Sequence, residues 1–186
     1  MNITVYCGAS KGNKEIFEEA TILLGKWIVE NNNILVYGGG KAGLMGVLAD
    51  SVINVGGKVI GVIPTFLQSR ELAHPNLTQL NIVNSMSERK LKMFDLADVF
   101  IALPGGPGTL EEITEMISWA RIGQNPNPCI FFNIEGYYNP IKQMYEDMEK
   151  NGFLTKKDRE KVLFSSSFDE ISSFIKDYNP PTIREY

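Results

Sequence analysis

Three glycine-rich segments each follow a short apolar run and are of a kind that can hold a phosphate. They are Cys7-Gly8-Ala9-Ser10, Gly38-Gly39-Gly40 and Pro104-Gly105-Gly106-Pro107-Gly108-Thr109. Glycine lets a backbone come close to a ligand, and a helix that starts just after such a loop offers N–H groups with partial positive charge. One loop of this kind is equally well explained by a tight turn. Three of them at one edge of a sheet favour an anion site.

The second segment has the Gly38-x-Gly40-x-x-Gly43 spacing of dinucleotide-binding loops. However, the next predicted strand ends in Gly61-Val62-Ile63-Pro64, without an acidic residue to bind a ribose diol. The P-loop pattern fails as well, because Leu35 takes the place of its first glycine and no hydroxyl residue follows Lys41. A mononucleotide therefore fits these loops better than NAD, FAD or a nucleoside triphosphate.

Charged residues stand at the starts of two predicted helices. Glu111 and Glu112 follow Thr109, and acidic residues in a first turn commonly complement the helix dipole. Two carboxylates would nevertheless repel a phosphate bound there, so one of them is better explained if it faces a positive charge that develops nearby. Arg89 and Lys90 also lie in a first turn, where basic residues are unfavourable. They form either a solvated surface pair or an anion clamp, with Arg89 as the more directional donor.

The composition excludes several classes of function. The 186 residues include 18 Lys and Arg against 22 Asp and Glu, a formal net charge of −4 that argues against broad nucleic-acid binding. His74 is the only histidine, expected at the surface or an interface, so a multi-histidine metal site is excluded. Cys7 and Cys129 are predicted to be buried thiols in a reducing cytoplasm. No apolar run approaches the ~20 residues of a membrane span, and we expect no signal peptide at the N-terminus.

Apolar runs of strand length alternate with helical periodicity along the chain. Strands are predicted at Ile3–Tyr6, Ile34–Tyr37, Lys58–Ile63, Leu80–Val83, Val99–Leu103, Cys129–Phe132 and Val162–Phe164. Helices are predicted between them from Ile16 to Ile28, at Leu44–Val55, Ser87–Ala97 and Thr109–Ile122, from Pro140 to Lys150, and after Ser167. We expect one nucleotide-binding domain over residues 1–186, a doubly wound (Rossmann-like) parallel sheet of six or seven strands with helices on both faces. Pro64–Gln79 is long for a connection and predicts a lid or interface loop.

The residues at these loops resemble the "Lonely guy" (LOG) family of cytokinin riboside 5′-monophosphate phosphoribohydrolases, once mislabelled as lysine decarboxylases. Pro104–Glu112 matches the Pro-Gly-Gly-x-Gly-Thr-x-x-Glu signature of that family. Tyr37–Gly46 and Met86-x-x-Arg89-Lys90 match two further blocks in the expected order, and the resemblance extends to about Gly152. Pro107 stands where family members usually carry an aromatic residue.

The resemblance implies hydrolysis of the N-glycosidic bond of AMP and N6-prenylated adenosine monophosphates, without a metal or organic cofactor. It also implies a homodimer with sites near the subunit interface. The thiols, the charge balance and the lack of a long apolar run predict a cytoplasmic protein without a nucleic-acid or membrane partner. Arg89 and Glu112 would be the catalytic pair, with Glu112 acting as base, electrostatic partner or transient nucleophile. The implied substrate-binding residues are Gly39, Gly40, Glu71, Met86, Lys90, Gly105, Gly106, Gly108, Thr109 and Glu111.

A second function remains open on the same residues. A molybdenum-cofactor carrier of the same fold holds a phosphorylated pterin without hydrolysing it. Such a carrier needs the anion cradle but not the pair of Arg89 and Glu112, and this sequence has both. A pyridoxal-phosphate decarboxylase is less favoured, since no lysine stands in a pattern typical of a Schiff base. The sequence does not identify the substituent on the base.

Overall fold

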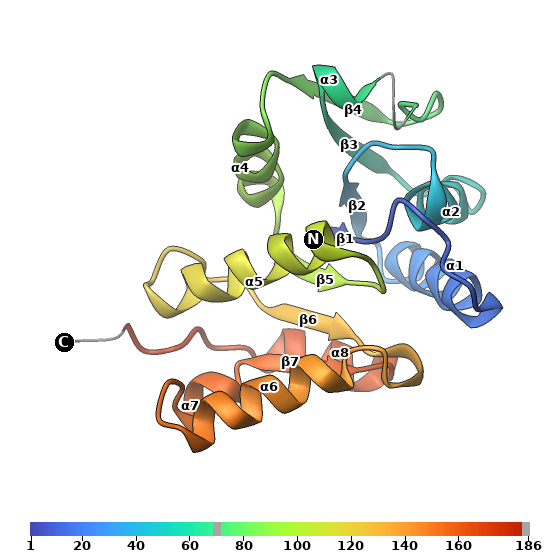
Figure 1. The fold of residues 1–186 in the computed structure, drawn as a ribbon. Coiled ribbons are helices and arrows are strands. Elements are labelled where there is room, and N and C mark those ends of the chain that lie inside the picture. Colours follow the sequence, from blue (N-terminus) through green and yellow to red (C-terminus); the bar gives the residue numbers. More distant parts are fainter. Residues whose placement is uncertain (69–71, 184–186) are drawn as a thin grey trace.

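A computed structural model of the protein describes residues 1–68 and 72–183. Seven strands form one sheet in the order β4-β3-β2-β1-β5-β6-β7, and every neighbouring pair is parallel (Figure 1). The strands are β1 Asn2–Tyr6, β2 Ile34–Tyr37, β3 Val59–Pro64, β4 Gln79–Val83, β5 Val99–Ala102, β6 Cys129–Phe132 and β7 Val162–Ser165. The prediction of a doubly wound parallel sheet is confirmed, and each predicted strand is present.

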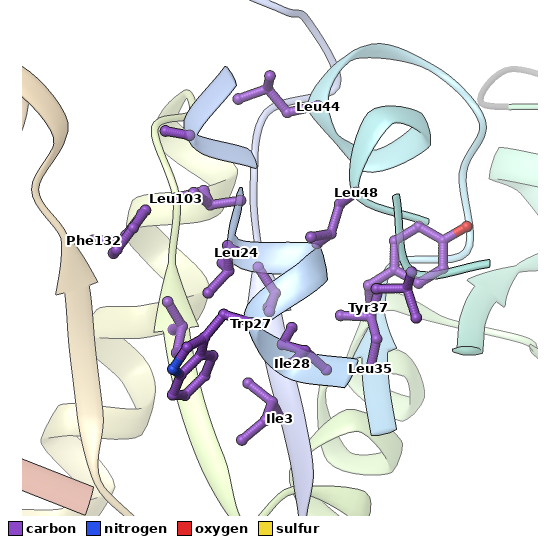
Figure 2. Close-up of a cluster of buried hydrophobic side chains, with 14 of the residues drawn as sticks. Ile3, Leu24, Trp27, Ile28, Leu35, Tyr37, Leu44, Leu48, Leu103 and Phe132 are labelled. Carbon is purple, nitrogen blue, oxygen red and sulfur yellow. The ribbon is translucent and has the colours of Figure 1, made fainter. Parts of the chain in front are cut away.

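Helices cover both faces of the sheet. They are α1 Glu15–Glu30, α2 Gly43–Ile53, α3 Thr65–Gln68, α4 Met86–Leu96, α5 Pro107–Arg121, α6 Asn139–Lys150, α7 Lys156–Arg159 and α8 Phe168–Asp177, with a 3₁₀ turn η1 at Ile134–Gly136. One core packs α1, α2 and α8 against the sheet, and Figure 2 shows Leu24, Ile28 and Leu48 within it. A second core packs α4, α5 and α6 against the opposite face. None of the helices in the described part of the chain is both long and apolar enough to cross a bilayer.

The segment predicted as a lid or interface loop contains some regular structure. Pro64 still belongs to β3, the short helix α3 follows it, and β4 begins at Gln79. Ala73 forms an isolated antiparallel bridge with Gly40, and the Leu72 carbonyl accepts a hydrogen bond from the Lys41 amide at 2.9 Å. Residues 72–74 therefore lie along the loop that follows β2. A role of this segment as a lid or interface stays a prediction.

The strand order places a topological switch point between β1 and β5. From β1 the chain builds outwards through β2, β3 and β4, and then returns to place β5 on the other side of β1. Tyr6 at the end of β1 is in register with Ala102 at the end of β5, and the Gly8 amide donates to the Pro104 carbonyl at 3.1 Å. Ligands of open parallel sheets bind at such a point, beyond the carboxyl ends of the strands. Two of the three glycine loops meet there.

Candidate active site

A cavity of about 310 Å³ lies at the switch point. Seven of the predicted site residues line it: Met86, Arg89, Gly106, Gly108, Thr109, Glu111 and Glu112. A larger cavity, of about 660 Å³, lies beside Arg121 and Lys161 and contains none of the predicted site residues. Gly105 and Gly106 also line a cavity of about 480 Å³, but Arg89 and Glu112 do not. The chemistry of the lining, rather than the volume, therefore identifies the cavity of about 310 Å³ as the candidate active site.

Five further residues line this cavity but were not among the predicted substrate-binding residues: Cys7, Gly8, Ala9, Met45 and Leu67. The first three belong to the glycine loop after β1, so that loop was the signal for them. Leu67 lies in the short helix α3, within the segment Pro64–Gln79 whose length predicts a lid or interface loop, but no pattern singled out the residue itself. Cys7 is half-buried and faces the cavity, so the prediction of a buried thiol is wrong at this position, whereas Cys129 is buried as expected.

Glu112 reaches the cavity because of the way α5 begins. Gly106 is the N-cap and Pro107 the first residue of the helix, where the missing N–H and fixed φ of proline are well tolerated. Glu112 follows Gly108 by four residues and Thr109 by three, so its side chain lies on the side of the helix where these two residues begin the first turn. The Glu112 side chain is buried, with 8% of the residue exposed. A carboxylate held there is largely shielded from water, which strengthens its interaction with nearby charge.

Arg89 enters from the first turn of α4, and the start of that helix is well defined. The Ser85 hydroxyl accepts a hydrogen bond from the Glu88 amide at 3.1 Å, and the Glu88 carboxylate accepts one from the Asn84 amide at 2.8 Å. Arg89 is 7% exposed, and its Nε is buried without a hydrogen-bond partner among the described residues. Its Nη1 donates to Met86 Sδ over 3.9 Å, a weak contact with sulfur. The guanidinium thus keeps donors that a ligand can engage.

Tyr6 connects the two charged groups electrostatically. It ends β1 and is 2% exposed. Burial raises the pKa of the Tyr6 hydroxyl well above its usual value, the negative charge of Glu112 raises that pKa further, and the positive charge of Arg89 lowers it. Glu112 and Arg89 line the same cavity as Cys7, the residue that directly follows Tyr6 at the carboxyl end of β1. The sequence did not single out Tyr6.

The glycines of the longest loop differ in what surrounds them. A Cβ added to Gly105 would lie 2.2 Å from Thr109 Oγ1, so Gly105 makes room for the threonine inside the protein. A Cβ added to Gly106 or Gly108 would meet nothing within 4 Å among the described residues beyond the local backbone. The Gly105 carbonyl also accepts a hydrogen bond from the Tyr137 hydroxyl at 2.6 Å. Packing therefore explains Gly105, whereas Gly106 and Gly108 leave the backbone open towards the cavity.

Lys90 forms ion pairs with side chains of the neighbouring helix. Its Nζ lies 2.5 Å from Glu111 Oε1 and 3.0 Å from Glu115 Oε2. The hydrogen bond that Lys90 donates to the Glu111 carboxylate is the main cause that raises the pKa of Lys90. These pairs join α4, which carries Arg89, to α5, which carries Glu112. Glu111 lines the cavity, and Lys90 lies next to it without lining it.

The remaining predicted site residues lie elsewhere. Gly39 accepts a hydrogen bond from the His74 amide at 3.0 Å, and Gly40 bridges to Ala73, so both support residues 72–74 and do not line the cavity. His74 is 4% exposed and its Nε2 lies 3.0 Å from Asp50 Oδ1, so the expected surface or interface position is wrong within this chain. Glu71 lies outside the described residues.

The fold is similar to that of solved carrier proteins. The Moco carrier protein from Chlamydomonas reinhardtii has a TM-score of 0.69 at 17% identity, with 95% of this chain and 98% of that chain covered. The molybdenum cofactor binding protein from Rippkaea orientalis has a TM-score of 0.66 at 19% identity, with 94% of each chain covered. At these identities the likeness shows a shared fold alone.

Sequence comparison is more specific. Residues 45–175 match the model of a family described as possible lysine decarboxylase. The chain is 40% identical over 178 residues to the probable cytokinin riboside 5′-monophosphate phosphoribohydrolase LOGL2 of Oryza sativa subsp. japonica, covering 96% of this chain and 73% of the rice protein. It is 42% identical over 178 residues to the cytokinin riboside 5′-monophosphate phosphoribohydrolase LOG1 of Arabidopsis thaliana, covering 96% of this chain and 84% of that protein. The resemblance seen in the residue blocks is confirmed: this chain belongs to the LOG family, the cytokinin riboside 5′-monophosphate phosphoribohydrolases.

Proposed function

We propose that the protein hydrolyses the N-glycosidic bond of purine nucleoside 5′-monophosphates and releases the free base and ribose 5-phosphate. The observation that carries the proposal is the placement of Arg89 and Glu112 in one cavity, beside the N-terminus of α5. The curated relatives that are about 40% identical over 96% of the chain carry the name of this activity. A carrier needs the glycine loops but has no use for this charged pair.

The reaction requires opposite charges at two places. Breaking the bond between C1′ and the base nitrogen builds positive charge on the ribose and negative charge on the departing base. The Glu112 carboxylate serves the ribose side as general base for water, as electrostatic partner of C1′ or as nucleophile, and each role requires its negative charge. The Arg89 guanidinium serves the base side by stabilising the leaving group.

The N-terminus of α5 supplies the third element, a site for the 5′-phosphate. The first N–H groups of a helix have no partner within the helix, and they attract anions. Gly108 and Thr109 contribute such groups, and Gly106 and Gly108 carry no side chain that would keep a phosphate away. Binding energy from the phosphate, which does not react, can position the ribose for bond cleavage.

Incubation with AMP and with isopentenyl-adenosine monophosphate tests the function. Chromatography should detect free base and ribose 5-phosphate from both nucleotides, and no base from adenosine at the same concentration. The ratio of the two rates then identifies the preferred substituent on the base. Tight binding of nucleotide without release of base would reject the hydrolase and favour the carrier.

Gly105 packs against Thr109, whereas Gly108 has open space beside it, so alanine substitutions at these two positions form a matched pair of variants. Gly108→Ala should leave the melting temperature unchanged or higher, because the added methyl group has open space around it in the described part of the chain and alanine favours a helix. The same methyl group would stand in the phosphate site, and we expect KM for AMP to rise about tenfold or more. Gly105→Ala should instead lower the melting temperature, because its methyl group would clash with Thr109. An unchanged KM in Gly108→Ala would place the phosphate elsewhere.

We also propose that the protein is a cytoplasmic homodimer. Charged nucleoside monophosphates are retained within the cytoplasm, where this substrate class would be met. Apolar side chains are exposed on neighbouring elements, with Phe66 on α3, Ile82 on the edge strand β4 and Leu91 on α4 exposed by 50%, 55% and 51%. Light scattering should give twice the 20.8 kDa mass of the chain. Leu91→Glu should shift the protein to the monomer, and a wild type of single-chain mass would contradict the dimer.

A further inference from the structure

Gly38 directly follows β2 and faces the side chain of Arg89 across the sheet edge. A Cβ at this position would lie 2.1 Å from Arg89 Nη2 and 3.2 Å from Arg89 Cζ. Non-bonded carbon and nitrogen atoms do not approach to 2.1 Å, so any side chain at position 38 excludes the observed guanidinium. The space that glycine leaves is the space that the guanidinium occupies.

Backbone conformation does not explain the glycine at this position. Gly39, its neighbour, has a φ of 78°, in the left-handed region that favours glycine, and Gly38 has no such positive φ. An alanine at position 38 could therefore adopt the same backbone. The other atom near the added Cβ is Met45 Sδ at 3.1 Å, the movable end of a flexible side chain. Of these contacts, only the one with Arg89 is too short to persist, so a Cβ at position 38 would force the guanidinium to move.

The guanidinium is held by shape more than by hydrogen bonds from the described residues. Its Nε is buried without a partner there, and Nη1 has the 3.9 Å contact with Met86 Sδ. Arginine has several rotatable bonds, and no hydrogen bond from Nε to the described residues fixes the orientation of Arg89, so packing has to contribute to it. The guanidinium lies against Gly38 and Met86, and Met45 lies beside Gly38.

We infer that Gly38 is a positioning residue for the proposed hydrolysis: it sets the direction in which Arg89 presents its guanidinium to the cavity. The inference rests on the proposed function and adds to it a residue that does not line the cavity. A methyl group at position 38 would displace Nη2 by about an ångström, and a misplacement of this size in a catalytic group can cost about 10²-fold in rate.

The effect of Gly38→Ala on the kinetics of the wild type and of the Arg89→Lys variant tests whether Gly38 positions Arg89. Gly38→Ala should lower kcat for AMP about 10- to 100-fold in the wild type, with KM changed much less. In Arg89→Lys, the ammonium ends near the former Cζ position and Nη2 is absent, so the same alanine should change kcat by no more than about twofold. An equal loss in both backgrounds, or no loss in the wild type, would overturn the inference and leave the proposed function standing.

Unfolding measurements test the contact independently of activity. Gly38→Ala should lower the melting temperature of the wild type, and the decrease should largely disappear in Arg89→Ala, where the guanidinium is gone. Should Gly38→Ala alone fail to fold, recovery of folding in the double variant would support the contact, and failure of both would overturn it. A wild type that releases no base would reject the proposed function. The melting temperatures of the wild type, the two single variants and the double variant would still show whether Gly38 and Arg89 are in contact.

Discussion

Replacement of Glu112 by glutamine should slow the release of base from AMP by about 10²–10⁴-fold. Glutamine has nearly the shape of glutamate but no charge, so it cannot accept a proton from water, attack C1′ or stabilise positive charge on the ribose. The carboxylate is buried beside the phosphate site, where little water is present to compensate for its loss. Steady-state rates from chromatography of base and ribose 5-phosphate, with a melting curve to show that the variant folds, provide the measurement.

Glu115→Gln is the matched control for this variant. Glu115 lies one turn further along α5 and pairs with Lys90 at 3.0 Å, outside the cavity lining. The Glu115→Gln substitution removes the same charge from the same helix as Glu112→Gln, so a general change in electrostatics would affect both variants alike. We expect a much smaller loss of rate in Glu115→Gln. Comparable losses in the two variants, or a Glu112→Gln variant with wild-type rate, would remove Glu112 from the reaction.

The strands could be predicted from the sequence because they are buried on both faces. The bounds of β2 and β6 agree with the predicted Ile34–Tyr37 and Cys129–Phe132 to the residue. Both runs are apolar along their length, since helices cover both sides of the sheet. The helices α3 and α7 were not predicted, because four residues are too few to form an apolar stripe with helical period.

Those parts of the candidate site that are formed by short contiguous segments could be predicted from the sequence. The loop from Pro104 to Thr109 and the first turn of α4 are short segments whose residue types are recognisable in the sequence. Their meeting in one cavity follows from the strand order, because ligands bind at the switch point of a parallel sheet.

Contacts between side chains from distant elements could not be predicted. Lys90 was expected to line the nucleotide site, but Glu111 and Glu115 on another helix hold it as an ion pair. His74 is buried, and its Nε2 lies 3.0 Å from Oδ1 of Asp50, which is 24 positions earlier in the chain. Gly38 belongs to a recognised glycine block, yet only the coordinates show that the guanidinium of Arg89 fills the space beside it. The sequence shows residue types and their spacing, but it does not show in which direction a long side chain points.

Arg89→Ala should lower kcat for AMP by about 10²–10³-fold, the usual cost of removing one donor that stabilises developing negative charge. The loss should appear mainly in kcat rather than KM, because the base becomes negative in the transition state and not in the bound nucleotide. Rates measured over a range of AMP concentrations separate the two parameters. Removing this largely buried side chain also leaves a space beside Gly38 and Met86 that a small cation can enter.

That space allows chemical rescue to distinguish a catalytic guanidinium from a structural one. Guanidinium ions added to Arg89→Ala can occupy the vacated position and restore part of the rate, whereas they should do nothing for Glu112→Gln, whose missing group is an anion. Sodium at the same ionic strength controls for screening. Rescue of Arg89→Ala without rescue of Glu112→Gln would show that the positive charge at position 89 stabilises the departing base. A loss confined to KM, or a variant with the wild-type kcat, would mean that Arg89 binds the nucleotide without stabilising the departing base, and bond cleavage would then have to rely on Glu112 and the phosphate site.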